Sequence, residues 1–155
     1  RLLSRFAPEL VEDHKLPGML PGRGAILTSF GQGQDSLLVV MMHLALSPRT
    51  RNNQLAYIRE RVADHQHVVL MGDMNTHAED LLERSPLRGS GLHTASLPGS
   101  YPSWKPARML DHILLSSSLS IEQVEVLPQP ISDHLPVAMH IRLPDQMCRP
   151  RETKR

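Results

Sequence analysis

The sequence predicts an α/β sandwich, in which one sheet packs against another and helices lie outside. Two continuous apolar runs, Leu37–Met42 and Val68–Met71, are typical of strands that are buried on both faces. Between them, Leu55, Ile58 and Val62 recur at steps of three and four residues, which indicates an amphipathic helix. This order of strand, helix and strand predicts a parallel pair joined by a right-handed crossover.

The first 22 residues give a weaker pattern. Pro8 interrupts the apolar face of a short helix that would consist of Leu2, Leu3, Phe6 and Leu10. Pro-Gly pairs at 17–18 and 21–22 predict turns. Ala25–Phe30 is typical of a strand, and the glycine-rich segment 31–34 predicts a hairpin loop after it.

The central helix has recognisable ends. Ser47 is a suitable N-cap, Pro48 suits the first helical position, and the pattern stops near residues 64–65. The side chains expected on the face away from the core are Arg51, Arg59, Glu60 and Arg61. A second, short helix is expected over Ala78–Arg84.

The second half of the chain contains a long loop and three further strands. Residues 86–106 are rich in Gly, Ser and Pro, and loops of this length are often functional. Leu110–Leu115 is typical of a strand, and Val124 and Val126 alternate with polar residues in another. The last strand is expected to be buried on one face only, through Val137, Met139, Ile141 and Leu143.

Composition excludes several classes of protein. The chain has 155 residues, one Cys and a formal net charge of +1, so a disulfide framework and a multi-Cys zinc site are excluded. Residues 149–155 carry +3 and the remainder −2, which argues against a dedicated duplex-DNA binder. Neither a transmembrane segment nor a signal peptide is visible, and the first residue is not Met. The compartment stays open, with a cytoplasmic location favoured.

Polar side chains gather at the ends of the predicted strands. They are His43, Asp73, Asn75, Asp111, Asp133 and His134. Each alone has an ordinary structural explanation, such as a turn or a buried hydrogen-bonded group. Together they are the side chains that a metal-dependent phosphoesterase uses, because oxygen ligands hold Mg²⁺ and a His can move a proton.

Four segments of the chain resemble motifs of the endonuclease/exonuclease/phosphatase superfamily. They are Val39–Leu44, Met71–Asn75, Arg108–Leu115 and Ser132–Val137, and they occur in the family's order. The superfamily includes DNase I-like nucleases, abasic-site endonucleases, sphingomyelinases and inositol-polyphosphate 5-phosphatases. The resemblance implies a DNase I-like four-layer α/β sandwich.

The resemblance also implies a role for each site residue. Asp73 would position or deprotonate the attacking water, and Asn75 would orient Asp73 or bind the phosphate. His134, paired with Asp111, would be the base or an electrostatic stabiliser. His43 would donate a hydrogen bond to the phosphate or a proton to the leaving oxygen. Which of Asp73 and His134 is the base stays open.

The implied cofactor is Mg²⁺ or Mn²⁺, with Asp133, Asp73 and Asn75 as candidate ligands. The family domain begins with a strand that carries a metal-binding Asn, followed by a Gln-Glu pair. This sequence contains neither. We therefore expect residues 1–146 to be the C-terminal part of such a domain, without its N-terminal part, and residues 147–155 to form a disordered basic tail.

Trp104 and Arg108 are candidate substrate-binding residues. They lie in or beside the long loop before the Asp111 strand, and an aromatic ring with basic neighbours can stack on a base or line a phosphate channel. The structural alternative is that Trp104 caps the core beneath the loop.

The leading functional hypothesis is a metal-dependent hydrolase of phosphate esters. Its substrate would be a nucleic acid, a lipid headgroup or a small phosphoester, and no obligatory protein partner is expected. The alternative is a truncated or degenerate domain without catalysis, which would act as a structural or binding piece.

Overall fold

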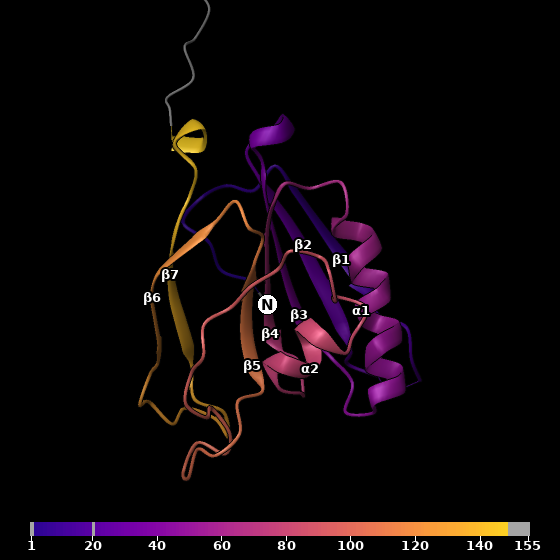
Figure 1. The fold of residues 1–155 in the computed structure, drawn as a ribbon, viewed down its shortest axis with the longest axis vertical. Helices are drawn as coiled ribbons and strands as arrows, with labels where there is room; N and C mark the ends of the chain where they lie inside the picture. Colours follow the sequence, from indigo (N-terminus) through magenta and orange to yellow (C-terminus); the bar gives the residue numbers. More distant parts are fainter. Residues whose placement is uncertain (1, 20, 149–155) are drawn as a thin grey trace, which may run out of the picture.

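The computed structural model describes residues 2–19 and 21–148 (Figure 1). Its main elements, in chain order, are β1 (Leu10–Lys15), β2 (Gly24–Phe30), β3 (Leu37–His43), α1 (Pro48–Val62), β4 (His67–Asp73), α2 (Ala78–Glu83), β5 (Asp111–Leu115), β6 (Ser120–Val126) and β7 (Val137–Arg142). Short 3-10 helices cover Gly33–Asp35 and Asp145–Cys148.

The first five strands form one mixed sheet in the order β1-β2-β3-β4-β5. β3 and β4 are parallel, as the strand–helix–strand pattern predicts, and every other pair in this sheet is antiparallel. β1 corrects the expectation of a short helix that includes Leu10. Four of its six residues are polar and five are exposed, so hydrophobic periodicity gives no signal, and pairing with β2 decides the conformation instead.

One face of this sheet is covered by α1 and α2. Its core contains Val40, Leu70 and Leu114 from the strands, together with Leu55 and Ile58 from α1. Ser47 occupies the N-cap position and Pro48 follows it, although the Ser47 side chain makes no capping hydrogen bond.

Arg51 corrects the prediction for the helix surface. It was expected to face away from the core, but it is only 9% exposed. Its guanidinium reaches the loops at the end of the sheet, as described below, and these contacts explain its burial.

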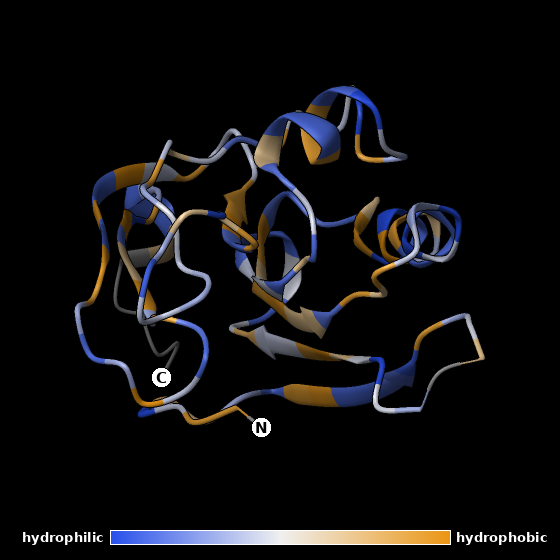
Figure 2. Cartoon of the chain, turned by 90° about the horizontal axis from the view of Figure 1, so that it is seen from below, coloured by the Kyte–Doolittle hydropathy of each residue, from blue (hydrophilic) through white to orange (hydrophobic). Residues whose placement is uncertain are grey.

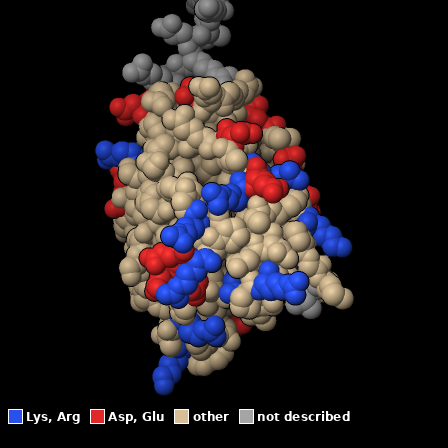
Figure 3. Space-filling model, turned by 45° about the vertical axis from the view of Figure 1, so that its right-hand side comes forward, with Lys and Arg blue, Asp and Glu red and all other residues tan. Residues whose placement is uncertain are grey.

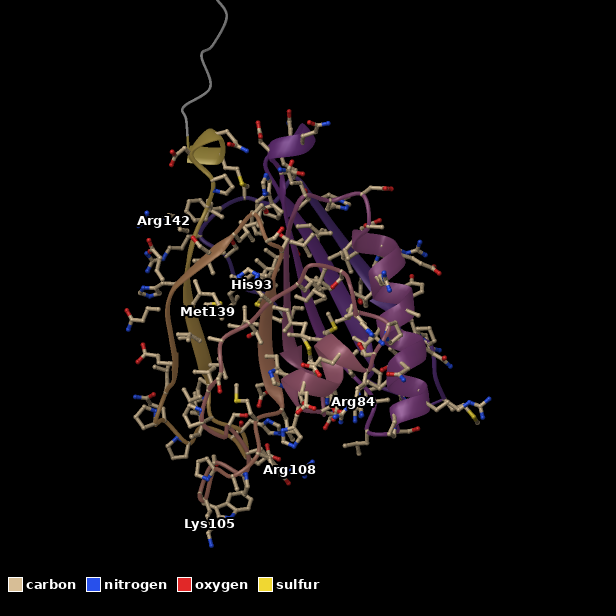
Figure 4. The ribbon with its side chains drawn as sticks, viewed as in Figure 1. Arg84, His93, Lys105, Arg108, Met139 and Arg142 are labelled. Carbon is tan, nitrogen blue, oxygen red and sulfur yellow. The ribbon has the colours of Figure 1, made fainter. Side chains whose placement is uncertain are left out.

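The other face of the sheet packs against the antiparallel pair β6–β7, which forms a separate two-stranded sheet. A smaller core joins Val69 and Leu115 to Met139 and Ile141, and Figure 4 shows Met139 on β7 between the two sheets. The apolar run of β3 was expected to be buried on both faces, yet only alternate residues are fully buried. The reason is that two strands cover less area than the five strands they face.

The architecture is therefore an α/β sandwich of sheet against sheet with α1 outside, and the layers are seen end on in Figure 2. Of the four layers expected, a helix outside the second sheet has no counterpart in residues 2–19 and 21–148. No described helix has the length and hydrophobicity that crossing a membrane requires.

The proposed domain limit falls inside the 3-10 helix Asp145–Cys148. The rest of the predicted tail, residues 149–155, lies outside the described residues.

Candidate active site

Three strands of the large sheet bring catalytic candidates to one edge. His43 is the parallel register partner of Asp73, and Asp73 is the antiparallel partner of Asp111. The register therefore aligns three polar residues that are far apart in sequence. The prediction that the strand ends gather these groups agrees with this arrangement.

Gly72 allows β3 and β4 to approach closely beside the site. It has a φ of 136°, and a Cβ atom there would lie 1.9 Å from the carbonyl oxygen of Met42. A side chain at this position would force the two strands apart. The absence of a side chain at Gly72 therefore helps to set the spacing between His43 and Asp73.

Asp73 lies between the two candidate histidines, His43 and His134. Its Oδ2 atom is 3.3 Å from Nε2 of His43 and 3.9 Å from Nε2 of His134. About a fifth of the Asp73 side chain is exposed. One carboxylate oxygen thus faces both rings from the floor of the site.

His134 is held in one orientation by Asp111. Its Nδ1 atom lies 2.7 Å from Oδ2 of Asp111, which also accepts a 2.6 Å hydrogen bond from the Ser100 hydroxyl. Burial alone would lower the pKa of His134. The hydrogen bond and the negative charge of Asp111, with smaller contributions from Asp73 and Asp133, outweigh burial and raise it above the ordinary value of 6.5.

His43 has the opposite electrostatic environment. Its pKa is lowered, first by burial and then by the positive charge of Arg23, whose Nη1 atom contacts Nε2 of His43. The carboxylate of Asp73 opposes this shift without reversing it. The pKa values of the two histidines are therefore shifted in opposite directions, and His134 gains a proton more readily than His43.

Asn75 shapes the loop after β4. Its φ of 51° is in the left-handed region, which Asn tolerates better than most residues. Its backbone N–H donates to Oδ1 of Asp73 at 3.0 Å, and its side-chain Nδ2 donates to the carbonyl of Leu44 at 2.8 Å. Asn75 therefore orients the Asp73 carboxylate and ties this loop to the loop after β3.

Two buried polar residues of α1 brace the same loops. Arg51 donates to the carbonyl oxygens of Ala45, Leu46 and Asn75 at 2.9–3.2 Å. Gln54 accepts from the backbone N–H of Ala45 at 2.8 Å. Burial lowers the pKa of Arg51, with Asp80 opposing the shift. Arg51 and Gln54 thus connect the loops after β3 and β4 to α1, the helix that covers the sheet.

Asp133 precedes His134 in the loop before β7 and is exposed. Its carbonyl accepts a 2.8 Å hydrogen bond from the backbone N–H of Ser103, while its carboxylate contributes only to the electrostatic environment of His134. The structure brings the carboxylates of Asp73 and Asp111 to the His134 ring, but leaves that of Asp133 at the surface.

The described residues form no group of three or more His, Cys, Asp or Glu side chains arranged to hold a metal ion. Asp73 and Asn75 are partly engaged, since Oδ1 of Asp73 accepts a backbone bond and Nδ2 of Asn75 donates one. The donor set seen in residues 2–19 and 21–148 is therefore too small to enclose a metal by itself.

Trp104 is 75% exposed. The structural alternative, in which it caps the core beneath the loop, is therefore wrong. The loop that carries it is tied to the Asp133 loop by two hydrogen bonds from Ser103. Arg108 is exposed and its guanidinium lies 6.0 Å from the ring centre of Tyr101, which in turn lies 4.8 Å from the ring of His134. Figure 4 shows Lys105 and Arg108 at the end of the molecule where β4 ends and β5 begins.

Several residues that contact the candidate site were not singled out from the sequence. Ser100, Tyr101 and Arg51 act through contacts with residues distant in the chain. A serine in a Ser-rich loop and an arginine on a helix are too common to single out. Only Arg51, three positions before Gln54 on the buried face, could have been suspected from helical spacing.

A hollow of about 400 Å³ opens beside the site, between the large sheet and the loop before β7. Its lining includes Gly72, Asp111 and His134, together with the apolar residues Met41, Met71 and Val137. Asp111 and His134 thus face an open space rather than packed protein.

A family model described as the endonuclease/exonuclease/phosphatase family matches residues 1–134. The chain belongs to this family. Comparison with the curated proteins gives no match.

Solved structures show that the fold is the DNase I-like α/β fold of this endonuclease/exonuclease/phosphatase family. A conserved protein of unknown function from Enterococcus faecalis superimposes with a TM-score of 0.71 at 20% identity, over 89% of this chain and 67% of that one. D. rerio TDP2, complexed with a single-strand DNA product, gives 0.68 at 13% identity, over 86% and 67%.

A third structure is the inositol polyphosphate 5-phosphatase domain of SPsynaptojanin, in complex with inositol (1,4)-bisphosphate and calcium ion. It gives a TM-score of 0.62 at 16% identity, over 88% of this chain and 56% of that one. The chain therefore spans about two thirds of the length of the first two structures and less of the third.

Proposed function

We propose that this chain carries the hydrolytic residues of a phosphoesterase, in which water attacks the phosphorus of a phosphate ester. The observation that supports this most is the arrangement of Asp111, His134 and Asp73 in a row. Asp111 fixes the His134 ring at Nδ1, and Nε2 of the same ring faces Oδ2 of Asp73 at 3.9 Å. The family's own description, which names endonucleases, exonucleases and phosphatases, supports the same chemistry.

In this proposal His134 and Asp73 share the work on the water. When His134 is neutral and its Nδ1–H donates to Asp111, the lone pair of Nε2 is free to take a proton. Asp111 then stabilises the imidazolium that forms, in the manner of other carboxylate–histidine pairs. Asp73, oriented by the backbone of Asn75, holds the water between the rings.

His43 completes the set from the other side of Asp73. Its lowered pKa keeps the ring neutral near neutral pH, which favours a hydrogen-bonding role toward the phosphate over that of a proton donor. Asn75 would act through Asp73, because both of its hydrogen bonds stay within the protein.

We include Mg²⁺ or Mn²⁺ as the cofactor. Mg²⁺ often binds through one or two carboxylates, with phosphate oxygens and water completing its shell, and Asp133 is exposed beside His134 to supply such a carboxylate. A bound metal would offset charge on the phosphate oxygens. Because Asp73 and Asn75 are partly engaged, the protein alone should bind the metal weakly.

The substrate would enter past the Trp104 loop. Trp104 is exposed, and Lys105 and Arg108 lie near it in sequence, so an apolar ring and two cations can meet a base, a sugar or a lipid headgroup next to the phosphate. On the face shown in Figure 3, Lys and Arg gather mainly over the lower half, with some Asp and Glu among them. The net charge of −2 over residues 1–148 favours a small phosphoester or a short single strand over duplex DNA.

Hydrolysis of bis(p-nitrophenyl) phosphate by the 155-residue chain, with Mg²⁺ or Mn²⁺, tests the proposal. Asp73→Asn and His134→Gln should each lower kcat/KM by at least about 100-fold, because each removes a group that handles the water. Chelation by EDTA should also remove the activity, and restored Mg²⁺ or Mn²⁺ should return it.

The matched controls are Asp64→Asn and His65→Gln. Both residues are exposed and follow α1 at the end of the sheet opposite the site, so both variants should keep the wild-type rate. Wild-type-like rates in Asp73→Asn and His134→Gln would contradict the proposal. Complete absence of turnover in the folded wild-type chain would favour the non-catalytic alternative.

A further inference from the structure

Arg23 reaches the active site from the turn between β1 and β2. The residue lies between Gly22 and Gly24, and its carbonyl accepts a 3.3 Å hydrogen bond from the backbone N–H of Leu16. Its side chain is half-buried, and its Nη1 atom contacts Nε2 of His43. A residue far from every motif of the sequence thus ends against a catalytic side chain.

Arg23 brings a positive charge to a part of the molecule that carries several carboxylates. Asp73 and Asp111 place two carboxylates in the site, and Asp133 adds a third nearby. Within residues 2–19 and 21–148, Arg23 is the only Lys or Arg whose side chain contacts His43, Asp73, Asp111 or His134. A negatively charged phosphate entering beside these carboxylates needs an opposing cation, and Arg23 is the nearest one.

The hydrogen-bonding capacity of Arg23 is also unfilled. A guanidinium has five N–H donors, and the Arg23 side chain contacts one acceptor, Nε2 of His43. A neutral imidazole is a weaker acceptor for the guanidinium than a phosphate group, because the phosphate carries negative charge and can accept two parallel N–H bonds. A bound phosphate should therefore draw the guanidinium away from the ring.

There is open space for a phosphate at this position. A hollow of about 470 Å³ lies against the strand ends and is lined by Gly22, Gly24, Ile26, Met41, His43 and Asp73, with Asp13 also at its wall. The two glycines that flank Arg23 add no side chains to the hollow. Arg23 itself does not line this hollow, but its guanidinium contacts His43, which does.

We propose that Arg23 binds two non-bridging oxygens of the substrate's phosphoryl group, next to His43. This inference rests on the phosphoester chemistry proposed above and assigns that site its cationic phosphate-binding residue. Arg23 forms two hydrogen bonds to the phosphate, because its planar N–H fork matches two phosphate oxygens and the ammonium of a lysine does not. In the absence of substrate, His43 holds the guanidinium in place.

Inorganic phosphate is the probe, and binding is followed in the 155-residue chain by NMR, through the Nε–Hε signal of Arg23 and the amide of Gly24. Both signals should shift in a saturable way. Arg23→Gln should weaken phosphate binding by about tenfold, as expected for the loss of a charged hydrogen-bonding partner. Arg23→Lys should recover only part of the loss. In hydrolysis, Arg23→Gln should raise KM.

Arg61→Gln is the matched control. Arg61 is an exposed arginine near the far end of α1, where it contacts Tyr57, so its loss changes the net charge equally without touching the site. Equal weakening of phosphate binding by Arg61→Gln and Arg23→Gln would overturn the inference, as would unchanged binding in Arg23→Gln or no saturable shift in the wild type.

The two proposals can fail separately. Phosphate binding that depends on Arg23, in a chain that hydrolyses no ester, would keep the anion site and remove the proposed activity. Hydrolysis that depends on Asp73 and His134, with phosphate binding indifferent to Arg23, would do the reverse.

Discussion

The two faces of the five-stranded sheet are packed very differently. On the helix side, Leu55, Leu70 and Leu114 are fully buried in a continuous core. On the side of β6–β7, Met139 and Ile141 are only partly buried against Val69 and Leu115. The same strands therefore take part in a complete core on one face and in a smaller, more open one on the other.

The site is built across this difference. His43 and Asp73 belong to β3 and β4, which the helix-side core holds in place. His134 and Asp133 come from the loop before β7, on the less covered side. Two of these four candidate residues thus depend on strands with a complete core. The other two depend on a loop that is held in place by hydrogen bonds to Asp111 and Ser103.

Gly72→Ala should have the largest effect on stability, because it disturbs the close approach of β3 and β4, two strands of the large sheet. A Cβ would lie 1.9 Å from the carbonyl oxygen of Met42, at a backbone φ of 136°. We expect a loss of more than about 3 kcal/mol in unfolding free energy, since both the steric clash and the φ oppose the substitution.

Urea denaturation measures this loss. Gly89→Ala is the control, because Gly89 also has a positive φ but has no atom within 4 Å of an added Cβ. It should cost only about 1 kcal/mol. Equal losses in the two variants would show that the close approach at Gly72 is not needed.

Truncation of one side chain in each core should show that the two faces contribute differently to stability. Leu70→Ala removes a fully buried side chain from the helix-side core, and should cost about 2–5 kcal/mol. Ile141→Ala, on the half-covered face, should cost about 1 kcal/mol, because less apolar surface is lost. Urea denaturation of the two variants measures both losses of stability. Similar losses would mean that the face toward β6–β7 is packed as completely as the helix side.

The smallest effect concerns protonation. The raised pKa of His134 means that its interaction with Asp111 stabilises the fold fully below the ordinary His pKa of about 6.5, and that this contribution is lost as pH rises through the higher folded value. Asp111→Asn should lower the pKa of His134 measured by NMR titration, and should flatten this fall in stability with pH. An unchanged pKa would place the origin of the shift elsewhere. The base role of His134 predicts that hydrolysis increases as pH rises through the same value.

The sequence was sufficient for the helix-side framework and for the expectation that the candidate residues lie close together. Hydrophobic periodicity is a local property, so β3, β4 and α1 and their parallel crossover could be predicted from it. The polar residues that follow the predicted strands could also be expected to lie close together, because sites in α/β sheets form at the ends of strands.

The remaining features depend on contacts between distant residues. β1 is a polar edge strand that exists through its pairing with β2. Arg51 is buried because three carbonyl groups from two loops converge on it. Trp104 is exposed because its loop hydrogen-bonds to the Asp133 loop instead of folding over the core. None of these has a signature within a short window of sequence.

The pairing of His43 with Asp73 across β3 and β4 also has a consequence for motion. Two residues linked by a ladder of backbone hydrogen bonds move together when the sheet flexes, so their separation varies little while the chain fluctuates. The loop with His134 can open by local fluctuation without disturbing that ladder. Amide hydrogen exchange should therefore be slow along β3 and β4 and faster around residues 132–134.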